Sequence, residues 1–465
     1  MRAVLHFGGR FTRAATTAAV LAAFAACSSV TDSLLDAEDP DLILPDNARS
    51  PAGAVAVANG ALGRLRNITA GSESTWMFGG LLVDEWGTSS TFIQNDETDW
   101  RKILDNNSQV QGMLRRLYLT RTAATQGAAL LNEFDKARTA LRGEMFFARG
   151  FAELQLASDF CNGIPLSDGS TETPVYTAPL PVATVFTAAA ASFDSALLVA
   201  TGTDAQSVLI QRAARVGKAR AQLGNNQFAA AAATVAGIPT SFRYQSTFSL
   251  TTSDNIIWNQ GTSAKRYSVA DNLEGNSRNL VVKNAIPFFS ARDPRLPVTD
   301  TRTVGQDGGT FVRTTTLYDR LTAIDVVNGI DARLIEAEAA LRGGNATQWL
   351  AILNGLRTGT DRVTSVGTVT LAANALAPLT MPATDTARVS LHFYEKAFWT
   401  FSRGQRLGDM RRLVRQFGRA PDDVYPVGIH YKTSRYGDDV VLPVTVDEST
   451  NPNLNGAPAC LDRKA

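Results

Sequence analysis

Residues 207–235 read SVLIQRAARVGKARAQLGNNQFAAAAATV and contain two helix-forming stretches. Gly224-Asn225-Asn226 separates the stretches, and glycine and asparagine readily adopt the backbone conformations of a turn. Alanines recur on both sides of this turn at spacings that put small side chains on one helix face. Because small side chains let two helices approach closely, the segment predicts an antiparallel hairpin of residues 207–223 and 228–235.

A second segment, residues 331–357, repeats this arrangement. It reads DARLIEAEAALRGGNATQWLAILNGLR, with Gly343-Gly344-Asn345 at the turn. Both segments carry an Ala-x-Ala-x-Leu pattern just before the turn, at residues 219–223 and 337–341. The pattern resembles the packing of tetratricopeptide-type repeats, which are about 34 residues long. It also fits any antiparallel helix pair.

The rest of the chain alternates apolar helical stretches with loops rich in glycine, serine and threonine. Ser50-Pro51 is typical of a helix start, and Phe147, Phe151 and Leu154 form an apolar stripe at helical spacing. Further helices are predicted at residues 50–66, 108–134, 135–159, 182–198 and 389–417, the last as one helix or a helix pair. We therefore expect a mostly α fold, with tetratricopeptide-like hairpins forming a curved frame in one domain over residues 47–465.

Three segments with little helical periodicity interrupt this frame, near residues 76–100, 239–324 and 358–386. The middle one contains short strand-like pieces at residues 280–282 and 310–313. Long loops on a rigid frame usually carry function. The sequence therefore predicts a loop-rich face with a few short strands.

Composition argues against several classes of function. The 465 residues are 44% hydrophobic and 19% charged, and Lys+Arg (45) balances Asp+Glu (44). A net charge of +1 does not favour a nucleic-acid partner. The histidines are His6, His392 and His430 alone, so a histidine-rich metal site is not expected, and no motif suggests a cofactor.

The N-terminus has the pattern of a lipoprotein signal. The first 13 residues contain Arg2, Arg10 and Arg13 and no acidic residue. The apolar stretch that follows ends in Leu-Ala-Ala-Phe-Ala-Ala-Cys at Cys27. This ending resembles a bacterial lipobox, with Phe24 where leucine is usual. We expect residues 1–26 to be a signal peptide, Cys27 to be lipidated, and residues 27–46 to be a membrane tether. The alternative is ordinary cleavage, with Cys27 a bystander.

The N-terminal stretch is too short to span a bilayer, and no other segment is expected to be apolar enough to cross one. Ser28 follows Cys27 where an inner-membrane retention signal would tend to show aspartate, which favours the outer membrane. The two remaining cysteines, Cys161 and Cys460, form no Cys-x-x-Cys pair. In an exported chain they are either a disulfide or two buried thiols, and the sequence leaves both open.

Four segments in order along the chain resemble SusD/RagB proteins. They are Arg149-Gly150-Phe151 with DFCNGIPL at residues 159–166, RDPRL at 292–296, Glu395 with FSRGQR at 401–406 and DMRR at 409–412, and Leu442-Pro443 with Glu448 and NPNL at 451–454. Two positions depart from the family pattern. Cys161-Asn162-Gly163 replaces Gly-Gly, and Arg403 replaces the glutamate before Gly404. The motifs look architectural, and Arg406 and Asp409 are spaced to pair on one helix face.

The resemblance implies a surface lipoprotein of a Gram-negative outer membrane. Such a protein binds an oligosaccharide or another large nutrient and passes it to a TonB-dependent, SusC-like transporter. It is not expected to be an enzyme. Adjacent acids such as Asp84 and Glu85 are the nearest match to a glycosidase pair, but acids on a loop are usually just solvated.

Binding a glycan needs aromatic faces, together with polar partners for hydroxyl groups. The candidates are Trp76, Trp86, Trp100 and Asn95 in one segment, and Trp258, Arg266 and Tyr267 in another. One hypothesis is that both groups line one ligand face. The alternative is that the aromatic residues pack in the core.

A different class of function also fits the helical hairpins. The chain would then be a helical-repeat scaffold that binds a protein partner in the periplasm or at the outer membrane. Exposed aromatic loops favour nutrient binding, whereas an apolar concave groove favours the scaffold.

Overall fold

The computed structural model describes residues 48–71, 74–171, 173–359, 365–366, 369–372, 375–455 and 460–465. The predicted signal peptide (residues 1–26) and the whole of the predicted tether (residues 27–46), with Cys27, lie outside the described residues.

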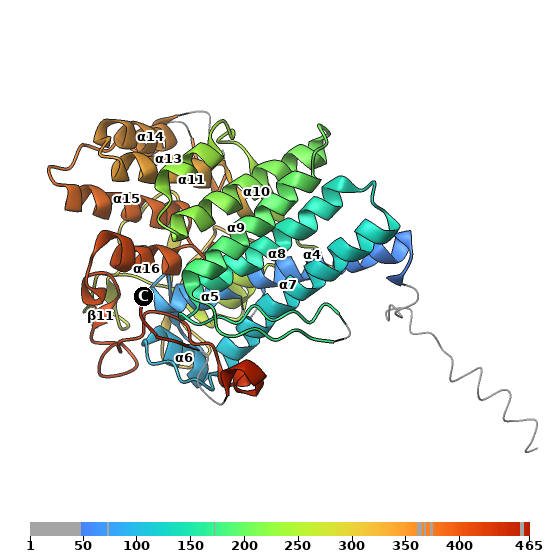
Figure 1. Cartoon of the computed structure of the whole chain (residues 1–465). Coiled ribbons are helices and arrows are strands. Elements are labelled where there is room, and N and C mark those ends of the chain that lie inside the picture. The colour runs from blue at the N-terminus through green and yellow to red at the C-terminus, as the bar shows by residue number, and fades with distance from the viewer. Residues whose placement is uncertain are drawn as a thin grey trace, which may run out of the picture.

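Helices that follow one another in the chain pack side by side and form the frame (Figure 1). They are α4 (Pro51–Ala70), α7 (Ser108–Phe134), α8 (Thr139–Asp159), α9 (Val182–Val199), α10 (Ala205–Gly224), α11 (Phe228–Val235), α13 (Gly329–Arg342) and α14 (Ala346–Thr358). The pairs α10–α11 and α13–α14 are the two predicted hairpins, and α11 packs against α13. The prediction of a mostly α fold is confirmed.

Local capping explains where these helices begin. The Ser50 hydroxyl accepts the N–H of Gly53 at the start of α4. Asn328 and Asp331 form a reciprocal capping box at the start of α13. The hairpin turns use left-handed backbone, at Asn226 (φ 62°) and Gly344 (φ 77°).

The predicted 389–417 stretch is a helix pair, α15 (Asp385–Trp399) and α16 (Arg406–Phe417). The helical conformation is interrupted between them, where Ser402 and Gly404 have φ of 56° and 62°. A Cβ atom at position 404 would lie 2.1 Å from Cδ1 of Trp76, so only glycine fits this close contact.

The prediction that residues 76–100 form a loop is wrong. The segment contains α5 (Thr75–Leu82), β1 (Trp86–Thr88) and α6 (Ile93–Asp99). Every residue of α5 is buried. A helix that is apolar on all sides has no amphipathic period, which is why the sequence pattern missed it.

Short strands fill the second insertion, as predicted. They are β2 (Arg243–Ser246), β3 (Tyr267–Val269), β4 (Leu273–Glu274), β5 (Leu280–Lys283), β6 (Val298–Val304), β7 (Phe311–Thr315) and β8 (Ile324–Asn328), with α12 (Ile256–Trp258) and the π-helical turn η1 (Asn259–Ser263) between β2 and β3. Strand β1 pairs with β3, β2 with β8 and β6 with β7, all antiparallel. Strand β5 pairs with both β4 and β11 (Val427–Gly428).

The remaining elements are short. Strands β9 (Ser365–Val366) and β10 (Val369–Thr370) pair within the third insertion, which is only partly described. Near the C-terminus are the 3-10 turns η2 (Pro421–Asp423), η3 (Val446–Thr450) and η4 (Pro452–Leu454).

Helix α9 corrects one expectation about membranes. Its 18 residues have a mean hydropathy of 1.7, so by length and composition it could cross a membrane. In the structure it packs between α8 and α10, with Val185, Phe186 and Phe193 buried. Its apolar composition therefore serves the core of the frame.

The family-like motifs hold distant parts of the chain together. The Arg295 guanidinium lies 2.7 Å from the Asp293 carboxylate and 2.8 Å from that of Glu395, and Arg357 also contacts Glu395 at 2.7 Å. The predicted pairing of Arg406 with Asp409 is wrong. Asp409 instead pairs with Lys396 and Arg412, while Arg406 Nε donates to the Val83 carbonyl.

The end of α8 joins the C-terminal segment. Cys161 and Cys460 form a disulfide, with their Cα atoms 5.7 Å apart. The Cys161 N–H donates to the Leu442 carbonyl and the Leu442 N–H to that of Asp159, at 2.8 and 2.9 Å. The first and fourth motifs therefore meet at one junction.

Candidate ligand-binding face

Two of the predicted ligand-binding tryptophans lie in the core. Trp76 is 0% exposed and packs edge-on against Phe151. Trp86 is 1% exposed, and its Nε1 donates to the Ser402 hydroxyl at 3.0 Å. Neither ring can stack on a sugar in this structure, so the core-packing interpretation holds for both.

Tyr267 and Asn95 are also buried, at 2% and 4% exposure. Tyr267 lies opposite Thr88 in the β1–β3 ladder. Asn95 lies on the buried side of α6. These two side chains support the loops from within and do not present a surface to a ligand.

The other three candidates are partly exposed. Trp100 makes an edge contact with His430, with ring centroids 6.1 Å apart. Trp258 packs one side against the core at the end of α12. The Arg266 guanidinium lies 5.2 Å from the ring centroid of Phe92.

Strand pairing brings the two predicted groups together. Trp86 lies opposite Val269, and the Ser89 N–H donates to the Arg266 carbonyl at 2.8 Å. Segments 86–100 and 258–267 are therefore neighbours, although they are far apart in the sequence.

Phe92 is the exposed aromatic residue at this junction. It precedes α6 and is 41% exposed, and the adjacent Ile93 is 50% exposed. Sequence reasoning placed Phe92 in the right segment but favoured the larger tryptophans. We call the surface formed by Phe92, Ile93, Arg266, Asp96 and Lys432 the Phe92 face.

Ion pairs hold the loops of the Phe92 face in place. Lys432 Nζ lies 2.8 Å from Asp96 Oδ1 and 3.0 Å from Asp307 Oδ2. It also donates to the Ser90 carbonyl at 3.3 Å. Burial alone would raise the pKa of Asp307, but hydrogen bonds from Thr310 and from the Gly309 N–H lower it to about 2. Lys432 thus links its own loop to two other segments, residues 90–96 and the loop of Asp307.

A polar pocket lies next to this ion-pair cluster. It has about 340 Å³ of empty volume and shares Thr310 with the Asp307 hydrogen bonds. Its lining includes Asn276, Asp300, Phe311, Arg313 and Tyr431. The pocket takes only a few water-sized groups, so it fits a hydroxyl or carboxylate group of a larger ligand and not a whole sugar ring. Its amide, carboxylate, guanidinium and phenol groups are of the kind that recognise sugar hydroxyls.

The predicted carboxylate pair lies below the surface. Asp84 and Glu85 are 2% and 1% exposed. Burial raises the pKa of Asp84 well above its usual range, and nearby Glu274 raises it further. Among the described residues, no group of His, Cys, Asp and Glu side chains could hold a metal ion.

Solved structures of other proteins share this architecture. A SusD superfamily protein from Bacteroides vulgatus matches with a TM-score of 0.58 at 16% identity, over 87% of this chain and 98% of that chain. The chain has the SusD fold. A SusD-like carbohydrate-binding protein from Bacteroides vulgatus matches with a TM-score of 0.59 at 13% identity, over 87% and 97% of the two chains. NanU from Bacteroides fragilis matches with a TM-score of 0.59 at 13% identity, over 91% and 100%.

At this identity the SusD fold is shared while most side chains differ. No protein-family model matches the sequence, and no curated protein matches it. The fold predicted from four short motifs is confirmed by these structures. The kind of ligand depends on the side chains, which differ between these proteins and this chain.

Proposed function

We propose that this protein binds an oligosaccharide or another large nutrient at the Phe92 face and delivers it to a TonB-dependent, SusC-like transporter. Lipid on Cys27 would hold it at the outer membrane, facing the cell surface. The observation that carries the proposal is an exposed aromatic ring and a polar pocket on a SusD fold, connected through the ion pairs of Lys432 with Asp96 and Asp307.

The chemistry of the Phe92 face suits a sugar. Part of the Phe92 ring surface is free for C–H stacking, and Arg266 is positioned against the same ring. Arg266 Nε is shielded from solvent and has no hydrogen-bond acceptor among the described residues. The Arg266 side chain as a whole is partly exposed, so its guanidinium can donate to a ligand hydroxyl or carboxylate.

The fold supports the same role. SusD-like proteins with this architecture include one described as carbohydrate-binding. The N-terminal lipobox pattern supports anchoring to a membrane.

The test is Phe92→Ala in the chain that begins at Ser28. A glycan array would first select an oligosaccharide, and calorimetry would then measure its affinity. We expect the variant to bind about tenfold more weakly, or about 1.4 kcal/mol, because the stacking ring is lost. Leu198→Ala is the matched control, since Leu198 is 78% exposed on α9 of the helical frame. Equal affinities for all three proteins would refute the Phe92 face as the binding site.

A further inference from the structure

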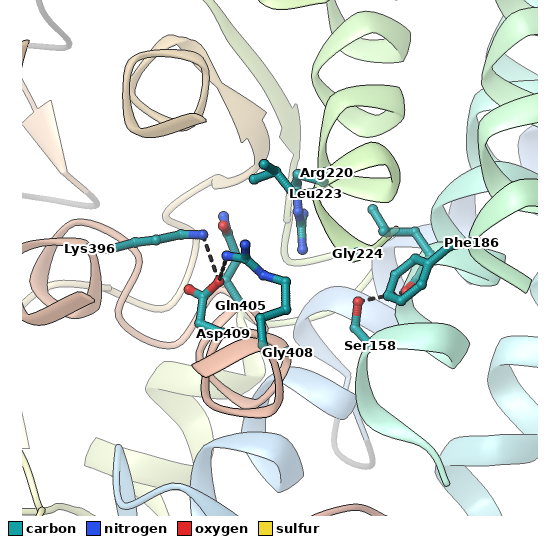
Figure 2. Close-up of a pocket in the computed structure, with 11 residues that line it drawn as sticks. Ser158, Phe186, Arg220, Leu223, Gly224, Lys396, Gln405, Gly408 and Asp409 are labelled. Atoms are coloured by element: carbon teal, nitrogen blue, oxygen red, sulfur yellow. Dashed lines mark hydrogen bonds and ion pairs between the residues drawn. The ribbon is translucent and has the colours of Figure 1, made fainter. Parts of the chain in front are cut away.

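A second pocket lies between α8, α9, α10, α15 and α16, with an empty volume of about 350 Å³ (Figure 2). Its polar lining is formed by Ser158, Arg220, Lys396, Gln405, Asp409 and Arg412. None of these residues belongs to the Phe92 face. Three of the side chains that line the pocket are basic, and one, that of Asp409, is acidic. Cations therefore outnumber anions in the lining.

The Asp409 carboxylate is already shared by two of the cations. Lys396 Nζ lies 2.8 Å and Arg412 Nη2 lies 2.7 Å from the same Oδ1 atom. Figure 2 shows the Lys396 side chain pointing to the Asp409 carboxylate. Asp409 therefore forms its ion pairs with Lys396 and Arg412 and makes none with Arg220.

Three further acids, Asp159, Glu338 and Asp331, lie near the pocket. Asp159 accepts a hydrogen bond from Gln155 Nε2 at 2.7 Å and forms no ion pair with a described residue, whereas Glu338 and Asp331 are ion-paired. The Glu338 carboxylate accepts two hydrogen bonds from Arg412. The Asp331 carboxylate accepts from Arg403 at 3.0 and 2.8 Å, and from Gln405 Nε2 at 3.0 Å. The Glu338 and Asp331 carboxylates therefore form ion pairs with Arg412 and Arg403, and neither pairs with Arg220.

Arg220 is the cation without a counter-ion. Among the described residues its guanidinium makes no hydrogen bond or ion pair, and its Nη1 atom is shielded from solvent. The Arg220 Cζ atom lies 5.7 Å from the centroid of the Phe151 ring. Burial lowers the pKa of Arg220 and outweighs the nearby acids Asp331, Asp409 and Asp159, which raise it, while Arg403 lowers it further. Keeping a guanidinium shielded from water without a hydrogen-bond acceptor or counter-ion lowers the stability of the folded protein.

We propose that this pocket binds a small anion, such as chloride, acetate or phosphate, held by Arg220 with help from Lys396 and Arg412. Water would accept hydrogen bonds from Arg220 but would leave its charge uncompensated. The space between the lining atoms takes only a few water-sized groups, which excludes a sugar ring.

The position of α16 also favours an anion. Gln405 and Gly408, at the start of this helix, line the pocket, and α16 begins without a side-chain cap. The positive end of the helix dipole therefore adds to the field of the three cations. A bound anion would tie α10 of the frame to the α15–α16 pair.

The experiment measures thermal unfolding of the chain from Ser28 at constant ionic strength. Sodium gluconate, whose anion is too large for the pocket, is replaced stepwise by chloride, acetate or phosphate. We expect at least one of these anions to raise Tm in a saturable way, on the order of 2 °C. A response no larger than that of gluconate for all three anions would overturn the proposal.

Arg220→Met should abolish this saturable rise, while Arg212→Met, also on α10, should keep it. In gluconate alone, Arg220→Met should unfold at the same or a higher temperature than the parent, because an uncompensated charge is removed. Retention of the anion response by Arg220→Met would contradict the assignment.

If Arg220→Met does not fold, line broadening of the chloride-35 resonance by the parent protein provides the test. Acetate or phosphate should compete with chloride and reverse the broadening. A sharp, unchanged chloride signal, together with no saturable rise in the Tm of the parent protein with acetate or phosphate, would overturn the proposal without any variant.

Discussion

Glu85 is an ionisable side chain held in the core next to Trp86. Burial raises the pKa of its carboxyl to about 8, although Arg406 and the Ser402 N–H, which donates at 3.2 Å, both lower it. The folded state therefore keeps a proton that the unfolded chain releases near its usual value of 4.5. Stability from this proton is fully present below about pH 4.5 and is lost as pH rises through about 8.

Glu85→Gln should remove this part of the pH dependence. Between pH 5 and pH 8.5 the parent protein should lose on the order of 3 kcal/mol more stability than the variant. Urea unfolding of both proteins at the two pH values measures the difference. Asp159 and Glu274, whose pKa values are also raised to about 7, contribute equally to both proteins and cancel. Parallel pH profiles would show that Glu85 ionises normally in the fold.

Arg403 replaces the glutamate that the family pattern shows, yet it has a definite structural role. It forms a buried two-point contact with Asp331 and donates to the Asp325 carbonyl at 2.9 Å. Arg403→Met should destabilise the protein by about 3–5 kcal/mol, because Asp331 keeps its buried charge without its main partner. Adding Asp331→Asn should recover part of this loss in urea unfolding. Additive losses would mean that the pair is not coupled.

Individual ligand residues were the least predictable part of the sequence. Trp76 and Phe92 have similar chemistry, but one is buried and the other is 41% exposed. The difference arises from contacts with distant segments, such as Gly404 against Trp76 and Arg266 against Phe92. A single sequence carries no signal for such contacts.

At the scale of elements, local patterns predicted the helical hairpins well. The alanine spacing and the Gly/Asn turn of residues 207–235 lie within one short window, and α10 and α11 follow it closely. Helix α5 was missed because TWMFGGLL is apolar on every side. The β1–β3 pair was missed because its strands are far apart in the chain.

The C-terminal segment depends on one covalent link. The Cys161–Cys460 disulfide closes a loop with a sequence separation of 299 residues. Reduction should therefore destabilise the protein by about 2–4 kcal/mol. Tm with and without dithiothreitol measures this, and a Cys161→Ser/Cys460→Ser variant should show no response. Two labelled thiols after alkylation of the denatured, unreduced protein would contradict the link.

At the scale of the whole molecule, the fold was predictable because its architectural motifs remain recognisable. Arg295 links the Asp-Pro-Arg turn to Glu395 of α15, and the end of α8 meets the C-terminal segment at Leu442. These contacts connect segments that the four motifs had marked. The same motifs say nothing of the ligand, since their side chains are engaged within the frame.

The central claim is that this chain works with an outer-membrane transporter. The measurement that tests it most directly is a pull-down of the protein, expressed with residues 1–27 in a Gram-negative bacterium that has SusC-like transporters, from detergent-solubilised outer membrane. Mass spectrometry would identify the partners, and Cys27→Ser, which should not be anchored, is the control. We predict recovery of a large TonB-dependent barrel with the parent protein. Recovery of periplasmic or assembly proteins without such a barrel would contradict the account and favour the helical-repeat scaffold.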